Sequence, residues 1–203
     1  MEEVFTYIYE NCVWGDNSNI AYNGSSGCGS TVEYNQETYV VFLKEFIKEK
    51  SIKTVVDLGC GDFQCGPIIY EDLKDVSYTG YEVYRKVVEY NKSIHPRPKY
   101  EFIHLDISKQ KEEIKGGDLC ILKDVLQHWS TALIIDLLDY LVHTRKFKYI
   151  LLCNCYNNPY HPNMDINIGG GRSLSCDIYP LNRYATKKLY IYDTKEVSVI
   201  EVY

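Results

Sequence analysis

The sequence lacks long apolar runs, closely paired cysteines and extended basic tracts. No stretch of about 18 apolar residues occurs, so we expect no transmembrane helix and no membrane partner. None of the eight cysteines belongs to a Cys-x-x-Cys pair, which favours buried free thiols over a metal site. Lysine and arginine occur in runs of two at most, and the net charge is −6. Tight binding to a nucleic-acid backbone is therefore not expected.

The first residues, MEEVFTYIYENCVWGD, also lack the features of a secretion signal. They begin with acidic residues and contain neither a positively charged region nor a small-residue cleavage site. We therefore expect a reducing compartment and a cytoplasmic location. With 203 residues, 45% of them hydrophobic and 25% charged, the chain has the composition of one globular domain.

We predict a single domain over 1–203. Within it, the pattern of apolar and polar residues changes near residue 51. The first part, 1–50, predicts helices over 1–12 and 35–50 around a Gly/Ser/Asn-rich loop at 14–34, whose part 24–31 is a candidate lid. The second part, 51–203, alternates short apolar runs with helical patterns. We predict strands over 54–59, 77–83, 101–106, 118–123 and 149–154, and helices over 66–74, 84–94, 109–115 and 130–144.

This alternation is typical of parallel strands joined by helical crossovers, hence of an open α/β sheet. The last two runs, 189–193 and 197–203, are separated by a short polar turn. They predict an antiparallel hairpin that closes the sheet.

Acidic residues follow the predicted strands one after another. Asp57 and Asp62 flank the first strand's glycine turn, Glu82 ends the second strand, Asp106 the third, and Asp124 follows the fourth after Lys123. Ligands of open α/β sheets bind beyond these carboxyl ends. Such carboxylates suit a ligand with ribose hydroxyls, an exocyclic amine and a cationic group. Glu82 is spaced to bind both ribose hydroxyls, Asp106 to accept from an adenine amine, and an α-ammonium would lie against the first loop.

Two other interpretations of these residues have to be weighed. Gly59 and Gly61 allow a tight turn, but Gln64 stands where a dinucleotide fingerprint needs its third glycine. The Lys-Ser/Thr of a P-loop is also absent, so a phosphate-binding loop is disfavoured. Each acid taken alone is equally compatible with a helix N-cap, and only the series as a whole favours a ligand site.

The motif VVDLGCGD at 55–62, followed by Glu82 and Asp106, resembles the class I S-adenosylmethionine-dependent methyltransferases over about residues 52–203. The resemblance implies a Rossmann-like sheet of seven strands, mostly parallel with the last one antiparallel, and helices on both faces. It implies S-adenosylmethionine as cofactor and S-adenosylhomocysteine as product. The cofactor-binding residues implied by this resemblance and by the strand-end pattern are Asp57, Gly59, Cys60, Gly61, Asp62, Glu82, Val83, Asp106, Ile107 and Lys123.

A narrower similarity is to a group of small bacterial and giant-virus methyltransferases. It is carried by Trp14-Gly15, the Ser26–Ser30 loop, Gly61-Asp62-Phe63, the run KDVLQH at 123–128 and NMDIN at 163–167. That group often has Ser-Gly-Pro-Gly-Ser in the loop, where this chain has Cys28 in place of the proline. The group does not define a substrate.

Methyl transfer requires alignment of the acceptor and, for a hydroxyl acceptor, a general base. His128 and Asp124 are the candidate catalytic residues, and both would face one side if the segment between them were helical. His128 is equally compatible with a histidine packed beside Trp129, and Asp124 with a helix cap. The Gly-, Asn- and Pro-rich segment 154–184 is the candidate acceptor pocket, or else a mobile surface loop. Candidate acceptor-binding residues are Ser30, Asn154, Tyr156, Asp165 and Arg172, with Tyr160 and Tyr179 as further aromatic candidates.

Three functions remain open at this point. The first is methylation of a small polar acceptor, most plausibly a hydroxyl of a sugar or glycan precursor. The second is methylation of nucleic acid or protein, although neither an Asn-Pro-Pro-Tyr-type motif nor a lysine-rich tetrad is evident. The third is a methyltransferase-like fold that binds the cofactor without chemistry, against which the intact glycine motif argues.

Overall fold

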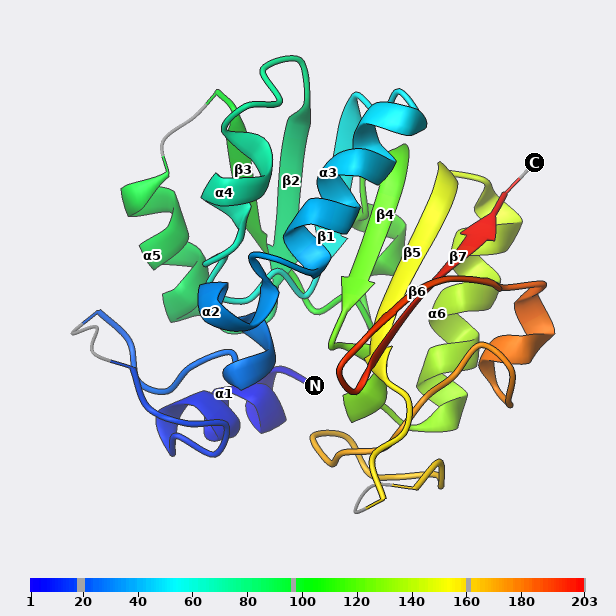
Figure 1. Cartoon of the computed structure of the whole chain (residues 1–203). Helices are drawn as coiled ribbons and strands as arrows, with labels where there is room; N and C mark the ends of the chain where they lie inside the picture. The colour runs from blue at the N-terminus through cyan, green and yellow to red at the C-terminus, as the bar shows by residue number, and fades with distance from the viewer. Residues whose placement is uncertain (18–20, 96–97, 160–161, 203) are drawn as a thin grey trace. The chain divides into compact units, whose positions relative to one another are not determined.

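The computed structural model describes residues 1–17, 21–95, 98–159 and 162–202. Seven strands form a sheet in the order β3-β2-β1-β4-β5-β7-β6, and the chain divides into two compact units, residues 1–107 and 108–203 (Figure 1). The single domain predicted over 1–203 stays a prediction. Among the described residues, no helix is both long and apolar enough to cross a membrane.

The first unit contains three parallel strands and the helices that precede and join them. Its elements are α1 (Glu2–Glu10), η1 (Cys28–Ser30), α2 (Val32–Asn35), α3 (Tyr39–Glu49), β1 (Thr54–Leu58), α4 (Gly66–Tyr70), β2 (Ser77–Glu82), α5 (Arg85–Ile94) and β3 (Tyr100–His104). Strand β2 pairs in parallel with both β1 and β3. Helix α5 buries Val87 and Val88 completely, because apolar residues recur on one face while Lys86, Glu89 and Lys92 face solvent.

The second unit combines a parallel pair of strands with an antiparallel hairpin. Its elements are η2 (Lys111–Glu113), β4 (Gly117–Lys123), η3 (Leu126–His128), α6 (Thr131–Thr144), β5 (Phe147–Cys155), η4 (Leu181–Tyr184), β6 (Lys187–Tyr192) and β7 (Lys195–Glu201). Strands β4 and β5 are parallel, whereas β7 runs antiparallel to both β5 and β6. The runs LCIL in β4 and ILLC in β5 are buried without interruption, as expected for central parallel strands.

The predicted strands and most predicted helices agree with the structure to within a few residues, and the closing hairpin is confirmed. Two helices differ. The helix predicted over 35–50 begins only at Tyr39, as α3. A separate short helix, α2, is capped by the Thr31 hydroxyl and ends at Asn35, and Thr38 lies outside the helical conformation at φ −124° and ψ −93°. The segment predicted as a helix over 109–115 contains only the short 3₁₀ turn η2.

Aromatic rings fill the space between α4 and the strands of the first unit. Phe63 lies 4.6 Å from Tyr78, 5.0 Å from Phe102 and 5.2 Å from Tyr100, measured between ring centroids. Gly66, at the start of α4, lies directly against the Phe63 ring, and a Cβ atom there would overlap it. The site is therefore packed without spare volume.

We predict that Gly66→Ala destabilises the fold by about 1–3 kcal/mol, because the added methyl group forces Phe63 out of the aromatic cluster. The measurement is the free energy of unfolding in urea. In a Phe63→Leu background the ring atoms that cause the overlap are absent, so the same glycine substitution should lower the free energy of unfolding by a smaller amount. Equal costs in both backgrounds would contradict the packing argument.

Candidate functional site

The turn that follows β1 owes its shape to two glycines. Gly59 and Gly61 have φ angles of +89° and +52°, in the region that side chains disfavour. The N–H groups of Gly59 and Cys60 both donate to the carbonyl of Tyr81, at 2.8 and 3.0 Å. The turn therefore lies against the end of β2, where the sequence predicted that acidic residues would gather.

Gly61 also allows an unusually close approach of another segment. A Cβ atom at this position would overlap the hydroxyl oxygen of Ser26. The Gly61 carbonyl accepts from Asn91 Nδ2 of α5 at 2.8 Å, and its N–H donates to Glu82 Oε2 at 3.1 Å. The glycine turn is thus held from three sides, by α5, by β2 and by the 24–31 loop.

Glu82 is buried at the end of β2 and accepts hydrogen bonds from the backbone. Besides Gly61 N–H, it accepts at Oε1 from the N–H groups of Val83 and Tyr84, at 2.8 and 2.9 Å. Burial raises the pKa of Glu82, and these three N–H groups oppose the rise. Within the described residues, Oε2 has one hydrogen-bond donor, the Gly61 N–H, so it retains the capacity to accept another hydrogen bond.

Asp62 is a buried carboxylate on the glycine turn. It is 5% exposed, and Oδ2 accepts from Gln64 Nε2 at 2.8 Å and from the Ser26 N–H at 3.4 Å. Its other oxygen, Oδ1, is buried and has no hydrogen-bond partner among the described residues. Burial raises the pKa of Asp62, and the hydrogen bonds from Gln64 and Ser26 oppose the rise. An uncompensated buried carboxylate oxygen of this kind requires a donor or a cation.

The other residues predicted to bind the cofactor in this unit lie around the same strand ends. Asp57 accepts from the Tyr78 hydroxyl at 2.9 Å. Asp106 is buried after β3, with the amine of Met1 at 3.3 Å, and Ile107 beside it is buried as well. Burial raises the pKa of the Cys60 thiol, whose sulfur packs against Gly80 of β2. The positions agree with the prediction, and the binding roles stay predictions.

In the second unit, Asp124 lies between two lysines. Lys123 Nζ is 2.7 Å from Asp124 Oδ2, and Lys195, from the start of β7, pairs with Oδ1. Burial alone would raise the pKa of Asp124, but the two ammonium groups outweigh it and lower the pKa to about 2. A carboxylate this acidic keeps its charge and is a poor proton acceptor near neutral pH. Lys123 is correspondingly engaged in an ion pair.

Lys195 was not predicted from the sequence. Its side chain is 5% exposed, and its Nζ donates to Asp124 and to Cys155 Sγ, the latter at 3.0 Å. The only sequence signal is a Lys-Glu pair at the start of an otherwise apolar strand. Asp124 is 71 residues away in sequence, so only the antiparallel pairing of β7 with β5 shows where the lysine lies.

His128 has a defined hydrogen-bonding arrangement. Its Nδ1 lies 2.7 Å from the Gly170 carbonyl, which can only accept, so Nδ1 carries the proton and Nε2 is the accepting nitrogen of the neutral ring. Gln127 Nε2 donates to that nitrogen at 3.3 Å, and Gln127 Oε1 accepts from the Cys155 N–H at 2.7 Å. The segment between Asp124 and His128 is not an α-helix, so the condition for both side chains to face one side is not met: Asp124 has φ +58°, and the 3₁₀ turn η3 follows.

The predicted acceptor residues are distributed along the second unit and, for Ser30, the first. Asp165 Oδ1 accepts from the Thr131 N–H at 2.7 Å, so it caps α6, and the buried Arg172 lies 3.4 Å from the same oxygen. Asn154 is buried in β5 with Oδ1 unbonded among the described atoms.

Two further candidate acceptor-binding residues, Tyr156 and Ser30, form hydrogen bonds with backbone carbonyls. Tyr156 N–H donates to the Thr194 carbonyl at 3.0 Å. The Ser30 hydroxyl donates to the Gly27 carbonyl at 2.7 Å, which closes the η1 turn. Tyr160 lies outside the described residues, as do parts of the predicted loops 14–34 and 154–184.

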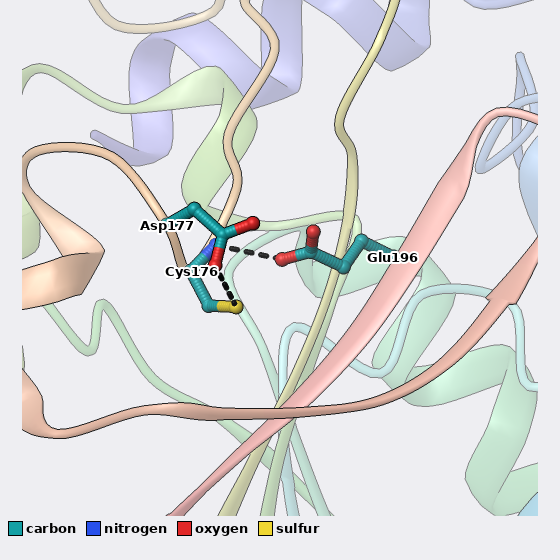
Figure 2. A group of neighbouring side chains, drawn as sticks. All are labelled: Cys176, Asp177 and Glu196. Atoms are coloured by element: carbon teal, nitrogen blue, oxygen red, sulfur yellow. Dashed lines mark hydrogen bonds between the residues drawn. The ribbon is translucent and has the colours of Figure 1, made fainter.

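Cys176, Asp177 and Glu196 form a cluster whose ligand atoms lie within 4.8 Å of one another (Figure 2). Lys188 already forms ion pairs with both carboxylates, with Nζ 2.5 Å from Asp177 Oδ2 and 3.1 Å from Glu196 Oε2. Glu196 also accepts from the Ser175 hydroxyl and the Cys176 N–H, at 2.8 and 2.6 Å. The cluster therefore anchors the 173–177 segment to β7, and we assign no metal site to it.

Comparison with solved structures identifies the fold. The methyltransferase domain of bacterial CtHen1 superposes with a TM-score of 0.64 at 15% identity, covering 80% of this chain and 97% of that domain. The chain has the class I methyltransferase fold. An O-methyltransferase family protein from Burkholderia thailandensis gives a TM-score of 0.64 at 14% identity, covering 84% of this chain and 57% of its own.

Human N-acetylserotonin methyltransferase, solved with S-adenosylmethionine, gives a TM-score of 0.62 at 15% identity, over 84% of this chain and 53% of its own. The chain thus spans just over half the length of these two enzymes. No family model and no curated protein matches the sequence, so the similarity to the bacterial and giant-virus group stays a prediction.

The paired lysines give a prediction for stability against pH. Because the pKa of Asp124 is lowered from 3.8 to about 2, its contribution of about 2 kcal/mol is complete above pH 4 and is lost as the pH falls toward 2. Replacing Lys195 by Met should raise the pKa of Asp124 and cost about 3–5 kcal/mol, because the carboxylate loses a buried partner.

The measurement is the free energy of unfolding of wild type, Lys195→Met, Asp124→Asn and the double variant. The double variant should lose less than the sum of the two single variants, since it leaves neither charge unpaired. Strict additivity would show that the two groups do not interact.

Proposed function

We propose that this protein is an S-adenosylmethionine-dependent methyltransferase that methylates a hydroxyl of a small polar acceptor. One observation carries the proposal: the glycine turn of a methyltransferase fold bears a buried carboxylate, Asp62, with an oxygen left without a partner among the described residues. The α-ammonium group of S-adenosylmethionine is a cation that matches this oxygen. The names of the similar structures, several of them O-methyltransferases, support the same reaction class.

The residues of the first unit fit the cofactor part by part. Asp62 would hold the α-ammonium group, Glu82 Oε2 would accept from a ribose hydroxyl, and Asp106 would accept from the adenine amine. The missing side chain at Gly61 makes room for Ser26, which contacts Asp62. When bound, S-adenosylmethionine supplies an electrophilic methyl group on a positively charged sulfur.

For the acceptor, we assign the general base to His128. The Gly170 carbonyl fixes the tautomer in which Nε2 accepts a proton, and Gln127 orients the ring from the same turn. Asp124 is less suited, because its ion pairs keep it a weak base. The acceptor that we favour is a hydroxyl of a sugar or glycan precursor, supported by the Asn- and Tyr-rich segment 154–184 and by the negative net charge, which disfavours polyanions. We further propose a cytoplasmic location.

The proposal predicts that the protein transfers labelled methyl groups from S-adenosylmethionine to an acceptor in an extract of its source. Nucleic-acid, protein, polysaccharide and small-molecule fractions are separated and counted. Label should enter the polysaccharide or small-molecule fraction. Asp62→Asn removes the negative charge that the ammonium group needs and should abolish the transfer, while Asp72→Asn, at an exposed surface ion pair, serves as the matched control.

Label in the nucleic-acid or protein fraction would support methyl transfer as the reaction but contradict the proposed class of acceptor. Absence of label together with normal binding of S-adenosylhomocysteine would contradict the enzymatic proposal and favour a cofactor-binding protein without activity. Equal transfer by wild type and Asp62→Asn would contradict the assignment of the site.

We also predict that His128→Ala slows methyl transfer by about 10²–10⁴-fold while leaving the affinity for S-adenosylhomocysteine unchanged, because a general base acts only in the transfer step. Single-turnover rates at saturating cofactor measure the effect. His143→Ala, at the exposed end of α6, is the matched control. A rate within a few-fold of wild type would remove His128 as the base.

A further inference from the structure

A serine from the amino-terminal loop forms a reciprocal contact with the glycine turn. The Asp62 N–H donates to Ser26 Oγ at 2.9 Å, and the Ser26 N–H lies 3.4 Å from Asp62 Oδ2. The two residues are 36 positions apart in sequence. The absence of a side chain at Gly61 makes the approach possible, since a Cβ atom there would overlap the serine hydroxyl.

The same serine is held from the other side by α1. The Tyr9 hydroxyl is 2.7 Å from Ser26 Oγ, and the Tyr9 ring is 2% exposed and stacks on Tyr84, with centroids 4.5 Å apart and an interplanar angle of 15°. Tyr84 begins the turn into α5 and donates its N–H to Glu82. The contact therefore belongs to a continuous network that ends at both buried carboxylates.

We propose that Ser26 is a positioning residue for the amino-acid end of the cofactor, acting through Asp62. The inference rests on the proposed function and deepens it. With Oδ2 engaged by Ser26 and Gln64, the Asp62 carboxylate is fixed in one orientation, and Oδ1 is the oxygen left for a ligand. The segment that carries Ser26 lies outside the α/β core, so cofactor binding depends on the amino-terminal loop as well as on the sheet.

Electrostatics explain why this support matters. Asp62 is desolvated, which raises its pKa, and its charge in turn raises the pKa of the buried Glu82 of β2. The Tyr9 and Tyr22 hydroxyls also interact with Asp62, and neither can supply positive charge, because a tyrosine is either neutral or negative. Hydrogen bonds from Ser26 and Gln64 oppose the rise in the pKa of Asp62 and so favour the ionised carboxylate, which the binding of an ammonium group requires.

The test is calorimetric titration with S-adenosylhomocysteine, which retains the amino-acid end of the cofactor. Ser26→Ala should weaken binding about 5–10-fold, the value of the neutral hydrogen bond, from the Asp62 N–H to Ser26 Oγ, that the substitution removes. Tyr9→Phe keeps the stacked ring and should weaken binding less. Ser25→Ala is the matched control, because Ser25 lies in the same loop and forms hydrogen bonds with Trp14 and Gly27 rather than with Asp62 in the described part of the chain.

The pH dependence of the affinity separates positioning from a loss of folding. Removing the Ser26 hydroxyl takes away a hydrogen bond that lowers the pKa of Asp62, so the loss of affinity on acidification should begin at higher pH in Ser26→Ala than in wild type. A variant that is merely less folded would bind a smaller amount of ligand, and the pH at which its affinity falls on acidification would be the same as in wild type.

Equal affinity of wild type and Ser26→Ala, or equal losses in Ser26→Ala and Ser25→Ala, would overturn the inference while leaving the proposed function intact. Absence of binding by the wild-type protein would overturn the proposed function itself. The two failures are therefore distinguishable in one series of titrations.

Discussion

The carboxylate of Glu82 is the contact on which the site of the first unit depends. It accepts three backbone N–H groups, two from the turn that leads into α5 and one from Gly61. A buried N–H without an acceptor costs free energy comparable to a lost hydrogen bond, so these groups need this side chain. Because the donors come from two segments, a single carboxylate fixes the glycine turn to the end of β2 and sets where α5 begins.

Asp124 of the second unit and the pair Asp62 and Glu82 of the first unit are carboxylates with different kinds of partner. In the second unit, Asp124 is enclosed by Lys123 and Lys195, and its pKa falls to about 2. In the first unit, the described residues offer Asp62 and Glu82 only neutral donors, and burial raises both pKa values. A buried carboxylate in an ion pair already has its counter-charge. A buried carboxylate that accepts hydrogen bonds only from neutral donors can still bind a cationic partner. This difference supports the proposed cofactor site in the first unit.

The sequence predicted best what depends on local patterns. The strand VVDL with its glycine turn, the acidic residues at Glu82 and Asp106, and the closing hairpin were all apparent, because periodicity and turn chemistry are local. It could not predict Lys195 or Ser26, whose partners lie 71 and 36 residues away. It also predicted a single helix over 35–50, since the helical pattern conceals the break that Thr38 introduces. Long-range pairing, rather than residue type, determined the positions of Lys195 and Ser26.

The polar residues of the predicted acceptor segment are largely bonded to one another and to the ends of neighbouring elements. Asp165 caps α6 and pairs with Arg172, and the adjoining glycines bond to His128 through its carbonyl and its ring. Such contacts determine the path of the segment and the tautomer of the histidine. A hydrogen bond that is already satisfied within the chain contributes little when a ligand arrives. Selection among acceptors in this protein would then depend mainly on the shape that these internal bonds impose, with few polar groups, such as the buried Asn154 Oδ1, left to recognise a particular hydroxyl.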